Sequence, residues 1–368
     1  MTAEVLGHQV SRRGLLAGAA GLVIGSALAG CGATQRSSAL RPVAPHGPEA
    51  SPSPSLLPSQ RGELYLGVAT ADETGLTGFT TAVGKQAALH VVYKSWGSET
   101  NSAFPAKTTA ADQKAGMLDI ITWEPWNTKE GVSQPNFRLS EIYGGKYDGY
   151  IRPFAQAIKQ YGGQVGVRLG HEANEGNHPW YPWSEKANGN RPGDFAKAYR
   201  YVFDLLASEG ATNALSVWCV NGVVPGGDPN DIRGLFPGQE YVDVVAEDAY
   251  PDGSRNVTQA DNGALAIARE LAPNKPLLIT ETGCPETADP GVKATRITDT
   301  FKYAHDNGVD GVCYSYYQTG KRDYRSKTVA VQAAFRQVGT LPYVVGAKPG
   351  VPPNLGSFTA AWRKSVAA

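Results

Sequence analysis

Short apolar segments recur along the chain after residue 60, separated by longer stretches of mixed polarity. They are rich in β-branched residues and apolar on both faces, which is typical of strands buried on both sides in a parallel sheet. The sequence predicts eight such strands: Glu63–Thr70, His90–Trp96, Leu118–Pro125, Gln164–Glu172, Leu215–Asn221, Val242–Tyr250, Pro276–Gly283 and Val309–Tyr317.

Helical periodicity separates several of these strands. Apolar residues recur at helical spacing in two groups, first Ile151, Phe154, Ala155 and Ile158, then Phe195, Tyr199, Val202 and Leu206. Gly162 and Gly210 follow these patterns, where a helix would end. Eight strands alternating with helices in one domain-sized length predict an α/β fold, the (β/α)8 TIM barrel. The alternative is an open doubly wound sheet, but no glycine-rich phosphate loop follows the first strand.

The N-terminus has the pattern of an export signal. Arg12 and Arg13 form a twin-arginine start, and the uncharged stretch Leu15–Leu28 is too short to span a bilayer comfortably. The segment Leu28-Ala29-Gly30-Cys31 resembles a bacterial lipobox, which implies lipidation at Cys31. We therefore expect twin-arginine export to the outer face of the cell membrane as a lipoprotein, or secretion if the signal is an ordinary cleaved one.

Composition divides the chain and limits its partners. Residues 32–60 contain six prolines and six serines, as expected of a linker between the signal (1–31) and a catalytic domain (61–340), with a C-terminal extension at 341–368. Lys plus Arg and Asp plus Glu both number 34, so nothing indicates nucleic-acid binding. Cys219, Cys284 and Cys313 allow at most one disulfide and have no metal-type spacing. We expect a monomer that needs no metal and no cofactor.

Two carboxylates end predicted strands on which a barrel would place an active site. Glu172 ends the fourth strand and Glu281 lies near the end of the seventh, and barrel active sites form at these carboxyl ends. Glycosidic bond cleavage needs such a pair: one group protonates the leaving oxygen and the other attacks the anomeric carbon. Retaining enzymes hold the two carboxyl groups about 5–5.5 Å apart. For either glutamate alone, an ordinary charged strand end is an equally good interpretation.

Three motifs resemble glycoside hydrolase family 26 of clan A. They are Arg168-Leu169-Gly170-His171-Glu172-Ala173-Asn174 followed by Trp180-Tyr181-Pro182-Trp183, the segment Phe236–Val245, and Leu277–Gly283 (LLITETG). The resemblance extends from about Glu63 to Val338. It implies a β-mannanase or β-glucanase type of enzyme that acts on a polysaccharide or oligosaccharide.

The resemblance also assigns roles. It makes Glu172 the acid/base and Glu281 the nucleophile, oriented by Arg168 and Tyr250. His171 is expected to hydrogen-bond the substrate or a glutamate. We expect further sugar contacts, or packing at the barrel rim, from the aromatic residues Trp123, Trp126, Trp180, Trp183 and Tyr316.

The sequence departs from the family at several positions. Ala173 replaces the usual methionine, and Glu175 stands where a glycine often follows the asparagine. The eighth strand ends in Tyr314–Gln318 rather than the Trp-Arg of the mannanases, which makes a glucan, a mixed-linkage glucan or a β-1,3-xylan plausible beside mannan. Glu124 adds a third carboxylate with no assigned role.

Two other classes of function compete with the hydrolase. A zinc hydrolase would need a second histidine four residues after His171, where Glu175 stands, so His178 does not complete the motif. A non-catalytic carbohydrate-binding lipoprotein would keep the aromatic residues and lose the carboxylates.

Overall fold

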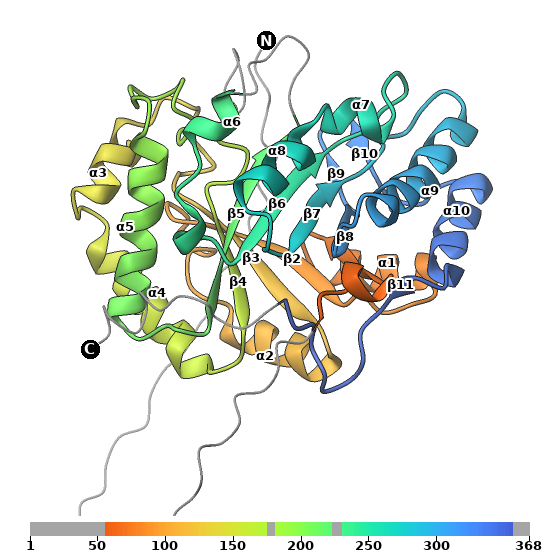
Figure 1. The fold of residues 1–368 in the computed structure, drawn as a ribbon, viewed down its shortest axis with the longest axis horizontal. Coiled ribbons are helices and arrows are strands. Elements are labelled where there is room, and N and C mark those ends of the chain that lie inside the picture. Colours follow the sequence, from red (N-terminus) through yellow and green to blue (C-terminus); the bar gives the residue numbers. More distant parts are fainter. Residues whose placement is uncertain (1–55, 175–180, 223–229, 356–368) are drawn as a thin grey trace, which may run out of the picture. The chain divides into compact units, whose positions relative to one another are not determined.

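The computed structural model describes residues 56–174, 181–222 and 230–355, and they contain the eight-stranded barrel that the sequence predicts (Figure 1). Each strand pairs in parallel with the next, and β1 pairs with β8 to close the ring. The strands are β1 (Leu64–Ala69), β2 (Leu89–Ser95), β3 (Leu118–Glu124), β4 (Val165–Leu169), β5 (Ala214–Asn221), β6 (Val244–Ala249), β7 (Leu277–Thr282) and β8 (Gly311–Ser315).

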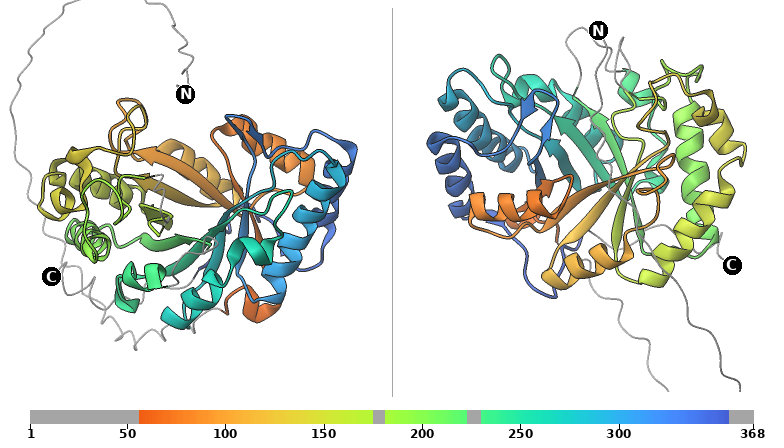
Figure 2. Two further views of the ribbon diagram at one scale, coloured as in Figure 1. Left: turned by 90° about the horizontal axis from the view of Figure 1, so that it is seen from above. Right: turned by 180° about the vertical axis from the view of Figure 1, so that it is seen from behind.

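Helices lie outside the ring of strands (Figure 2). They are α1 (Glu73–Val83), α2 (Ala106–Ala115), α3 (Leu139–Tyr143), α4 (Asp148–Tyr161), α5 (Asp194–Ser208), α6 (Asn230–Gly234), α7 (Val257–Asp261), α8 (Ala264–Leu271), α9 (Pro290–Asp306) and α10 (Val329–Thr340). The apolar positions that predicted α4 and α5 are all buried. Gly162 ends α4 in the left-handed conformation, which glycine adopts without steric cost. Within the described residues, no helix is both long and apolar enough to cross a membrane.

Side chains alternate between the two faces of each strand and form two apolar layers. Leu89 and Val91 of β2 belong to a small cluster inside the barrel, with Leu118 and Ile120 of β3. The alternate apolar residues of β3, Ile121 and Trp123, face outward and join the larger core beneath the helices. Because the period of a strand is two, this alternation decides which residues near a strand end reach the active site.

The chain on either side of the barrel also packs against it. A short 3-10 helix, Ser59–Arg61, precedes β1, and the Ser59 hydroxyl donates to Asp310 at 2.6 Å. After α10, strand β11 (Val344–Val345) pairs with β1, and Leu355 is buried in the interior cluster. The extension predicted at 341–368 therefore begins as part of the fold. A hairpin of β9 (Gln318–Thr319) and β10 (Arg322–Asp323) follows β8.

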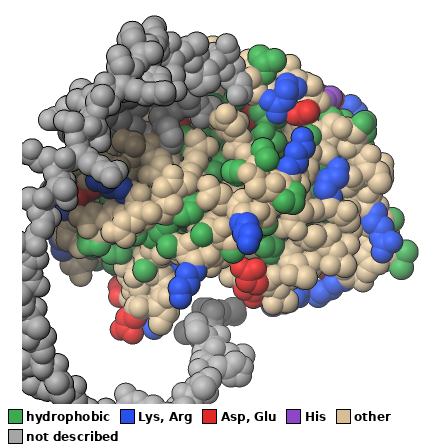
Figure 3. Space-filling model, turned by 90° about the horizontal axis from the view of Figure 1, so that it is seen from below, with side chains coloured by type: hydrophobic (Ala, Val, Ile, Leu, Met, Phe, Trp, Pro, Cys, Tyr) green, Lys and Arg blue, Asp and Glu red, His purple; other side chains and the backbone are tan. Residues whose placement is uncertain are grey.

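The state of the cysteines and the distribution of surface charge are the next features of the fold. Cys219, Cys284 and Cys313 are buried free thiols. On the face drawn in Figure 3, the acidic and basic side chains that carry a colour are scattered singly among apolar and neutral ones. The export signal, Cys31 and most of the predicted linker lie outside the described residues, so their assignments stay predictions.

Candidate active site

Arg168 is the centre of a polar cluster inside the mouth of the barrel. The side chain lies on the inward face of β4 and has no exposed surface. Its guanidinium donates to the Thr122 hydroxyl at 2.9 and 2.6 Å and to the Asp248 carboxylate at 2.9 and 2.6 Å. It also donates to Glu281. One buried cation therefore joins β3, β4, β6 and β7, and it fixes the position of both carboxylates.

A shift in strand register places Glu281 in this cluster. Glu247 of β6 pairs with Ile279 of β7, but Asp248 pairs with Glu281, so Thr280 is an extra residue on β7. Without the extra residue, alternation would turn Thr280 and Glu281 to opposite faces. With it, the Thr280 hydroxyl donates to Asp248 at 2.8 Å while Glu281 also reaches Arg168. Bulges commonly re-aim a side chain beside an active site.

The protonation of the two carboxylates follows from their sharing one cation. Burial disfavours the charge of both groups, and Arg168 opposes burial. Arg168 and a hydrogen bond from Tyr250 outweigh burial at Glu281, whose pKa lies below its usual value. Burial dominates at Asp248, and with the negative charge of Glu281 nearby it raises the Asp248 pKa to about 7. Of the two carboxyl groups, Glu281 is therefore the one that ionises more readily.

Tyrosines surround the Glu281 carboxylate. Tyr250, directly after β6, donates to Glu281 at 2.6 Å, and its oxygen lies 2.8 Å from the Ser315 hydroxyl. Tyr93 and Tyr317 lie near the same charge, since burial and then Glu281 raise the pKa of both phenols. All three rings are half-buried, so each keeps surface open to the mouth. The expected contact of Tyr250 with Glu281 is present.

Glu172 lies three residues beyond β4 in a strained backbone conformation. Its φ is +53°, one of three positive values among the described residues other than glycine. Such strain costs about 1–3 kcal/mol and persists only where surrounding contacts impose it. Gly170 also has a φ of +53°, and a Cβ there would lie 3.1 Å from Trp183. Glu172 is 8% exposed and lies near Tyr181, whose pKa is raised by burial and next by the Glu172 charge.

Hydrogen bonds on both sides hold the loop that carries Glu172. The Trp183 indole donates to the His171 carbonyl at 2.7 Å. Asn174 and Asn221, the last residue of β5, exchange two bonds of 2.8 and 2.7 Å. These contacts fix the residues before and after Glu172, so the side chain is pre-organised without a ligand. Asn174 is part of the sequence motif, but its anchoring role depends on Asn221, which no local sequence pattern connects to it.

His171 is a neutral hydrogen-bonding group. Burial and then Arg168 lower its pKa to about 3. Its Nε2 lies 3.1 Å from the Tyr181 hydroxyl, while Nδ1 is buried and has no hydrogen-bond partner among the described residues. The imidazole therefore keeps one buried ring nitrogen without a partner among the described residues, and the predicted contact of His171 with a substrate stays a prediction.

Glu124 contributes a third carboxyl group to the mouth. It ends β3, is 8% exposed, and lies 3.3 Å from the indole nitrogen of the half-buried Trp126. Burial, opposed by the Trp126 hydrogen bond and reinforced by the Glu281 charge, raises its pKa to about 7. Glu124 therefore holds its proton to higher pH than an exposed glutamate does.

Comparisons with known proteins agree with these motifs. The model of glycosyl hydrolase family 26 matches residues 146–281, which include both glutamates. Endoglucanase H of Acetivibrio thermocellus is 29% identical over 241 residues, covering 62% of this chain and 24% of that protein. Over residues 146–281 the chain is similar to glycosyl hydrolase family 26, in agreement with the family that the sequence motifs indicate. A mannan endo-1,4-beta-mannosidase of Bifidobacterium adolescentis is 27% identical over 158 residues, covering 40% of this chain and 16% of that protein.

Solved structures of family 26 proteins share the fold. A β-mannanase from Bacteroides ovatus superposes with a TM-score of 0.62 at 14% identity, covering 78% of this chain and 92% of that one. An endo-β-1,4-mannanase from Cellulomonas fimi gives a TM-score of 0.62 at 16% identity, covering 80% and 74%. The chain spans about a quarter or less of the two curated relatives named above. The activities that their names state are therefore properties of longer proteins.

Three of the aromatic residues expected to contact sugar are part of the core of the barrel. Trp123 is fully buried and stacks on Phe154 of α4 at 4.2 Å between ring centroids. Trp183 is fully buried, and Tyr316 packs on Phe79 while its hydroxyl lies 2.7 Å from Ser326. None of these rings offers a face to a ligand, so the expectation was wrong for all three. Trp126 keeps an open surface, and Trp180 lies outside the described residues.

Strand alternation explains these errors and identifies the residues that replace them. Thr122 and Glu124 face into the barrel, so Trp123 between them must face outward. Ser315 contacts Tyr250 inside the mouth, so Tyr317 shares its side and Tyr316 does not. The open aromatic surface of the mouth is formed by Tyr93, Trp126, Tyr181, Tyr250 and Tyr317.

One set of side chains in the mouth has the composition of a metal site. Atoms of His171, Asp248 and Glu281 lie within 4.8 Å of one another. The guanidinium of Arg168 already bonds both carboxylates and supplies the positive charge that a metal would bring. A cation that competes with a buried arginine at this position would lose those hydrogen bonds. The arrangement therefore fits acid–base and nucleophilic chemistry rather than metal-assisted hydrolysis.

Proposed function

We propose that the chain is a retaining, endo-acting glycoside hydrolase that cleaves a β-linked polysaccharide by double displacement. The observation that carries this proposal is the state of Glu281, a buried carboxylate kept ionised by Arg168 and Tyr250 at the mouth of the barrel. A nucleophilic carboxylate needs this combination of negative charge, fixed orientation and limited access of water. The family, the fold and the endo-acting relatives support the same class of reaction.

The proposed reaction uses Glu172 and Glu281 in two steps. Glu281 attacks the anomeric carbon while Glu172 gives its proton to the departing glycosidic oxygen, which breaks the C–O bond and leaves a glycosyl ester on Glu281. A water molecule then enters, Glu172 takes its proton, and the hydroxyl oxygen displaces Glu281 from the sugar. The anomeric configuration is retained, and both glutamates return to their starting protonation states.

We propose a β-glucan as the first substrate to test, with β-mannan second. Endoglucanase H matches a larger part of this chain than the mannosidase does. The residues that follow β8 are Tyr316, Tyr317 and Gln318 rather than the Trp-Arg pair expected of a mannanase. Mixed-linkage glucan and β-1,3-xylan remain in the set of candidate substrates for the same reason.

A polysaccharide screen with product analysis tests the activity and its mechanism together. Soluble protein lacking residues 1–31 is incubated with glucans, mannans and xylans, and reducing ends and product lengths are measured. Early products of mixed length indicate endo action, and proton NMR of the first products should show the β-anomer. The α-anomer as first product would contradict double displacement. Binding without any reducing-end release would favour the rival interpretation, a non-catalytic carbohydrate-binding lipoprotein.

We also propose that the protein is a monomer held at the membrane by lipid on Cys31 after twin-arginine export. The support is the sequence pattern Arg12-Arg13 together with Leu28–Cys31. Replacing Cys31→Ser should move the protein from the membrane fraction to the medium without changing its specific activity. Wild-type protein from its own host that carries no lipid by mass spectrometry would contradict this proposal.

A further inference from the structure

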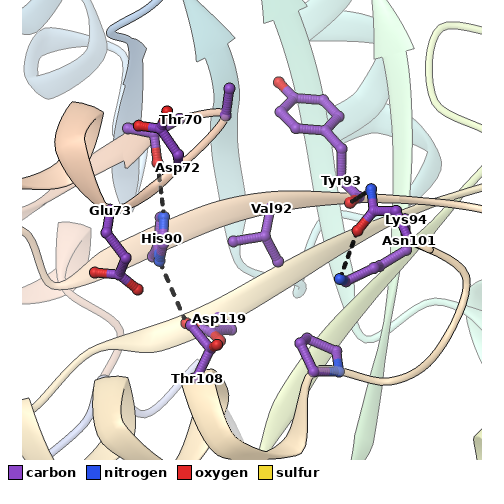
Figure 4. A pocket seen from close by; sticks show the side chains of 12 residues that line it. Thr70, Asp72, Glu73, His90, Val92, Tyr93, Lys94, Asn101, Thr108 and Asp119 are labelled. Carbon is purple, nitrogen blue, oxygen red and sulfur yellow. Dashed lines mark hydrogen bonds and ion pairs between the residues drawn. The ribbon is translucent and has the colours of Figure 1, made fainter. Parts of the chain in front are cut away.

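A second polar site lies outside the barrel wall, on the far side of β2 from the Arg168 cluster. A cavity of about 430 Å³ opens beside the N-terminal ends of α1 and α2 (Figure 4). His90 and Asp119 line its inner end, and Asp72 and Glu73 lie at its rim. The proposed hydrolase mechanism uses none of these residues.

Three side chains from three elements meet at the inner end of this cavity. His90 of β2 and Asp119 of β3 are directly paired in the strand register, and both face outward. Asp112 extends from α2, and its Oδ2 lies 2.9 Å from His90 Nδ1. Asp119 Oδ1 lies 3.8 Å from the same nitrogen. One potential ligand atom from each residue lies within 4.8 Å of the others.

The Asp119 carboxyl group is buried, and the side chains that act on it are those of His90, Asp112 and Thr109. The residue is 2% exposed, and neither carboxylate oxygen accepts a hydrogen bond from the described residues. Buried carboxylates are costly unless they are paired or bind a metal ion. A lone imidazole 3.8 Å away, already bonded to Asp112, leaves both Asp119 oxygens available to a ligand at the cavity wall.

The two sites differ in the basic side chains available to neutralise their carboxylates. In the mouth, Arg168 lies between the two carboxylates and bonds both. At the outer site, Asp112 and Asp119 face only His90, and Glu73 adds a further negative charge nearby. Lys94 lines the cavity, but its ammonium donates to Asn101 at 2.7 Å. The outer site therefore has acidic ligands without an arginine to neutralise them.

We propose that His90, Asp112 and Asp119 bind a divalent transition-metal ion, with Zn²⁺ as the first candidate. One imidazole nitrogen and two carboxylate oxygens form a mixed N/O ligand set that suits Zn²⁺ or Mn²⁺, whereas Ca²⁺ prefers oxygen ligands in larger number. The three ligands leave one position open toward the cavity, which a water molecule can fill. The ion would fasten β2, β3 and α2 together.

The distances are close to those that an ion needs. Ligand atoms bound to Zn²⁺ at about 2.0–2.2 Å in a tetrahedron lie roughly 3.3–3.6 Å apart. The separations of 2.9 and 3.8 Å from His90 Nδ1 bracket that range. Because no hydrogen bond restrains Asp119, rotation of its side chain can close the longer gap. Thr70 lies 3.0 Å from His90 Nε2 and fixes the ring while Nδ1 exchanges its proton for the metal.

Metal titration of the chelator-treated protein tests the proposal. Zn²⁺ added in a calorimeter should bind at one equivalent and release about one proton, seen by comparing buffers of different ionisation enthalpy. Zn²⁺ should also raise the Tm, because an ion that binds only the folded state stabilises it. Ca²⁺ should bind far more weakly. Uptake of no Zn²⁺ at micromolar concentrations would overturn the proposal.

Matched variants locate the ion. Asp119→Asn should abolish binding, whereas Asp72→Asn removes a charge from the same cavity and should leave it unchanged. Asp72 caps α1 by accepting from Gly75, and asparagine keeps that cap. Loss of binding in Glu281→Gln would place the ion in the barrel mouth and refute the assignment, as would unchanged binding in Asp119→Asn. If Asp119→Asn does not fold, Asp112→Asn decides, since it removes another ligand of the same proposed site and should also abolish binding.

Discussion

The hydrogen bond from Tyr250 to Glu281 makes a measurable contribution to the proposed nucleophile. Tyr250→Phe removes one oxygen and keeps the ring, so packing at the mouth changes little. The bond is 2.6 Å long and ends on a carboxylate that is almost fully buried, at 4% exposure. Hydrogen bonds to charged groups contribute about 1.5–3 kcal/mol. One pKa unit corresponds to about 1.4 kcal/mol, so the loss should raise the Glu281 pKa by roughly one to two units.

The sign of the effect on activity follows from the role of Glu281. The carboxylate must be ionised to attack, and the Tyr250 hydroxyl stabilises the ionised form. The acidic limb of the profile of kcat/KM against pH should therefore move to higher pH by the same one to two units. Loss of orientation adds to this, so kcat/KM at the optimum should fall roughly 10- to 100-fold.

The assay compares Tyr250→Phe with a matched control in the same strand-end region. Tyr316→Phe removes a hydroxyl that bonds Ser326 outside the mouth, so its acidic limb should match that of the wild type. Initial rates on a chromogenic β-glycoside are measured from pH 4 to 9, and folding is checked by Tm. An unshifted acidic limb in Tyr250→Phe would refute the view that this bond sets the charge of Glu281. An equal shift in Tyr316→Phe would show that the effect is not specific to Glu281.

Three further predictions follow from the same contacts. Glu281→Ala should lose turnover on all substrates, whereas Glu172→Ala should keep a burst of phenol from dinitrophenyl glycosides. Azide should restore turnover of the Glu172 variant and yield a β-azide. A β-azide formed by the Glu281 variant would show that the roles are reversed. Burial raises the pKa of Glu124 from 4.5 to about 7, so the free energy of unfolding should fall as pH rises through that interval and the buried acid ionises. Glu124→Gln, which stays neutral, should have a free energy of unfolding about 2–3 kcal/mol higher than the wild type at pH 8 in urea. Trp183→Ala should lose about 3–5 kcal/mol of stability because the ring is fully buried, while Trp126→Ala should mainly raise KM. The opposite pattern in Tm and KM would contradict the placing of Trp183 in the core and of Trp126 at the mouth.

The strands were predictable because each carries its own local signal. All eight appear within about three residues of the predicted ends, since continuous β-branched segments between helical patterns have few other solutions in a parallel sheet. The largest difference is at β4, which ends at Leu169 rather than at Glu172. The positive φ at Gly170 and Glu172 turns the chain out of the sheet there. Gly170 is consistent with a turn here, but no local sequence signal indicated that Glu172 would also adopt the left-handed conformation.

The face of a strand on which a residue lies was partly predictable from the sequence. If Glu124 faces the mouth, its strand neighbour Trp123 faces the helices, and this requires only the two-residue period of β3. The same reasoning selects Tyr317 over Tyr316. Glu281 is different, because its inward position depends on Thr280 being an extra residue in the register between β6 and β7. That shift is a property of two paired strands, and one strand alone does not specify it.

The charge of the proposed nucleophile Glu281 depends on Asp248 as well as on Arg168, and the sequence motifs gave Asp248 no role. Arg168 carries a single positive charge and bonds both Asp248 and Glu281, so full ionisation of both would leave one buried negative charge uncompensated. His171 does not compensate it, because burial keeps its ring neutral. Burial raises the Asp248 pKa to about 7, whereas the Glu281 pKa lies below its usual value, so the Arg168 charge favours the ionised form mainly at Glu281. The Asp248 carboxyl group accepts two hydrogen bonds from the guanidinium and so holds Arg168 in place beside Glu281.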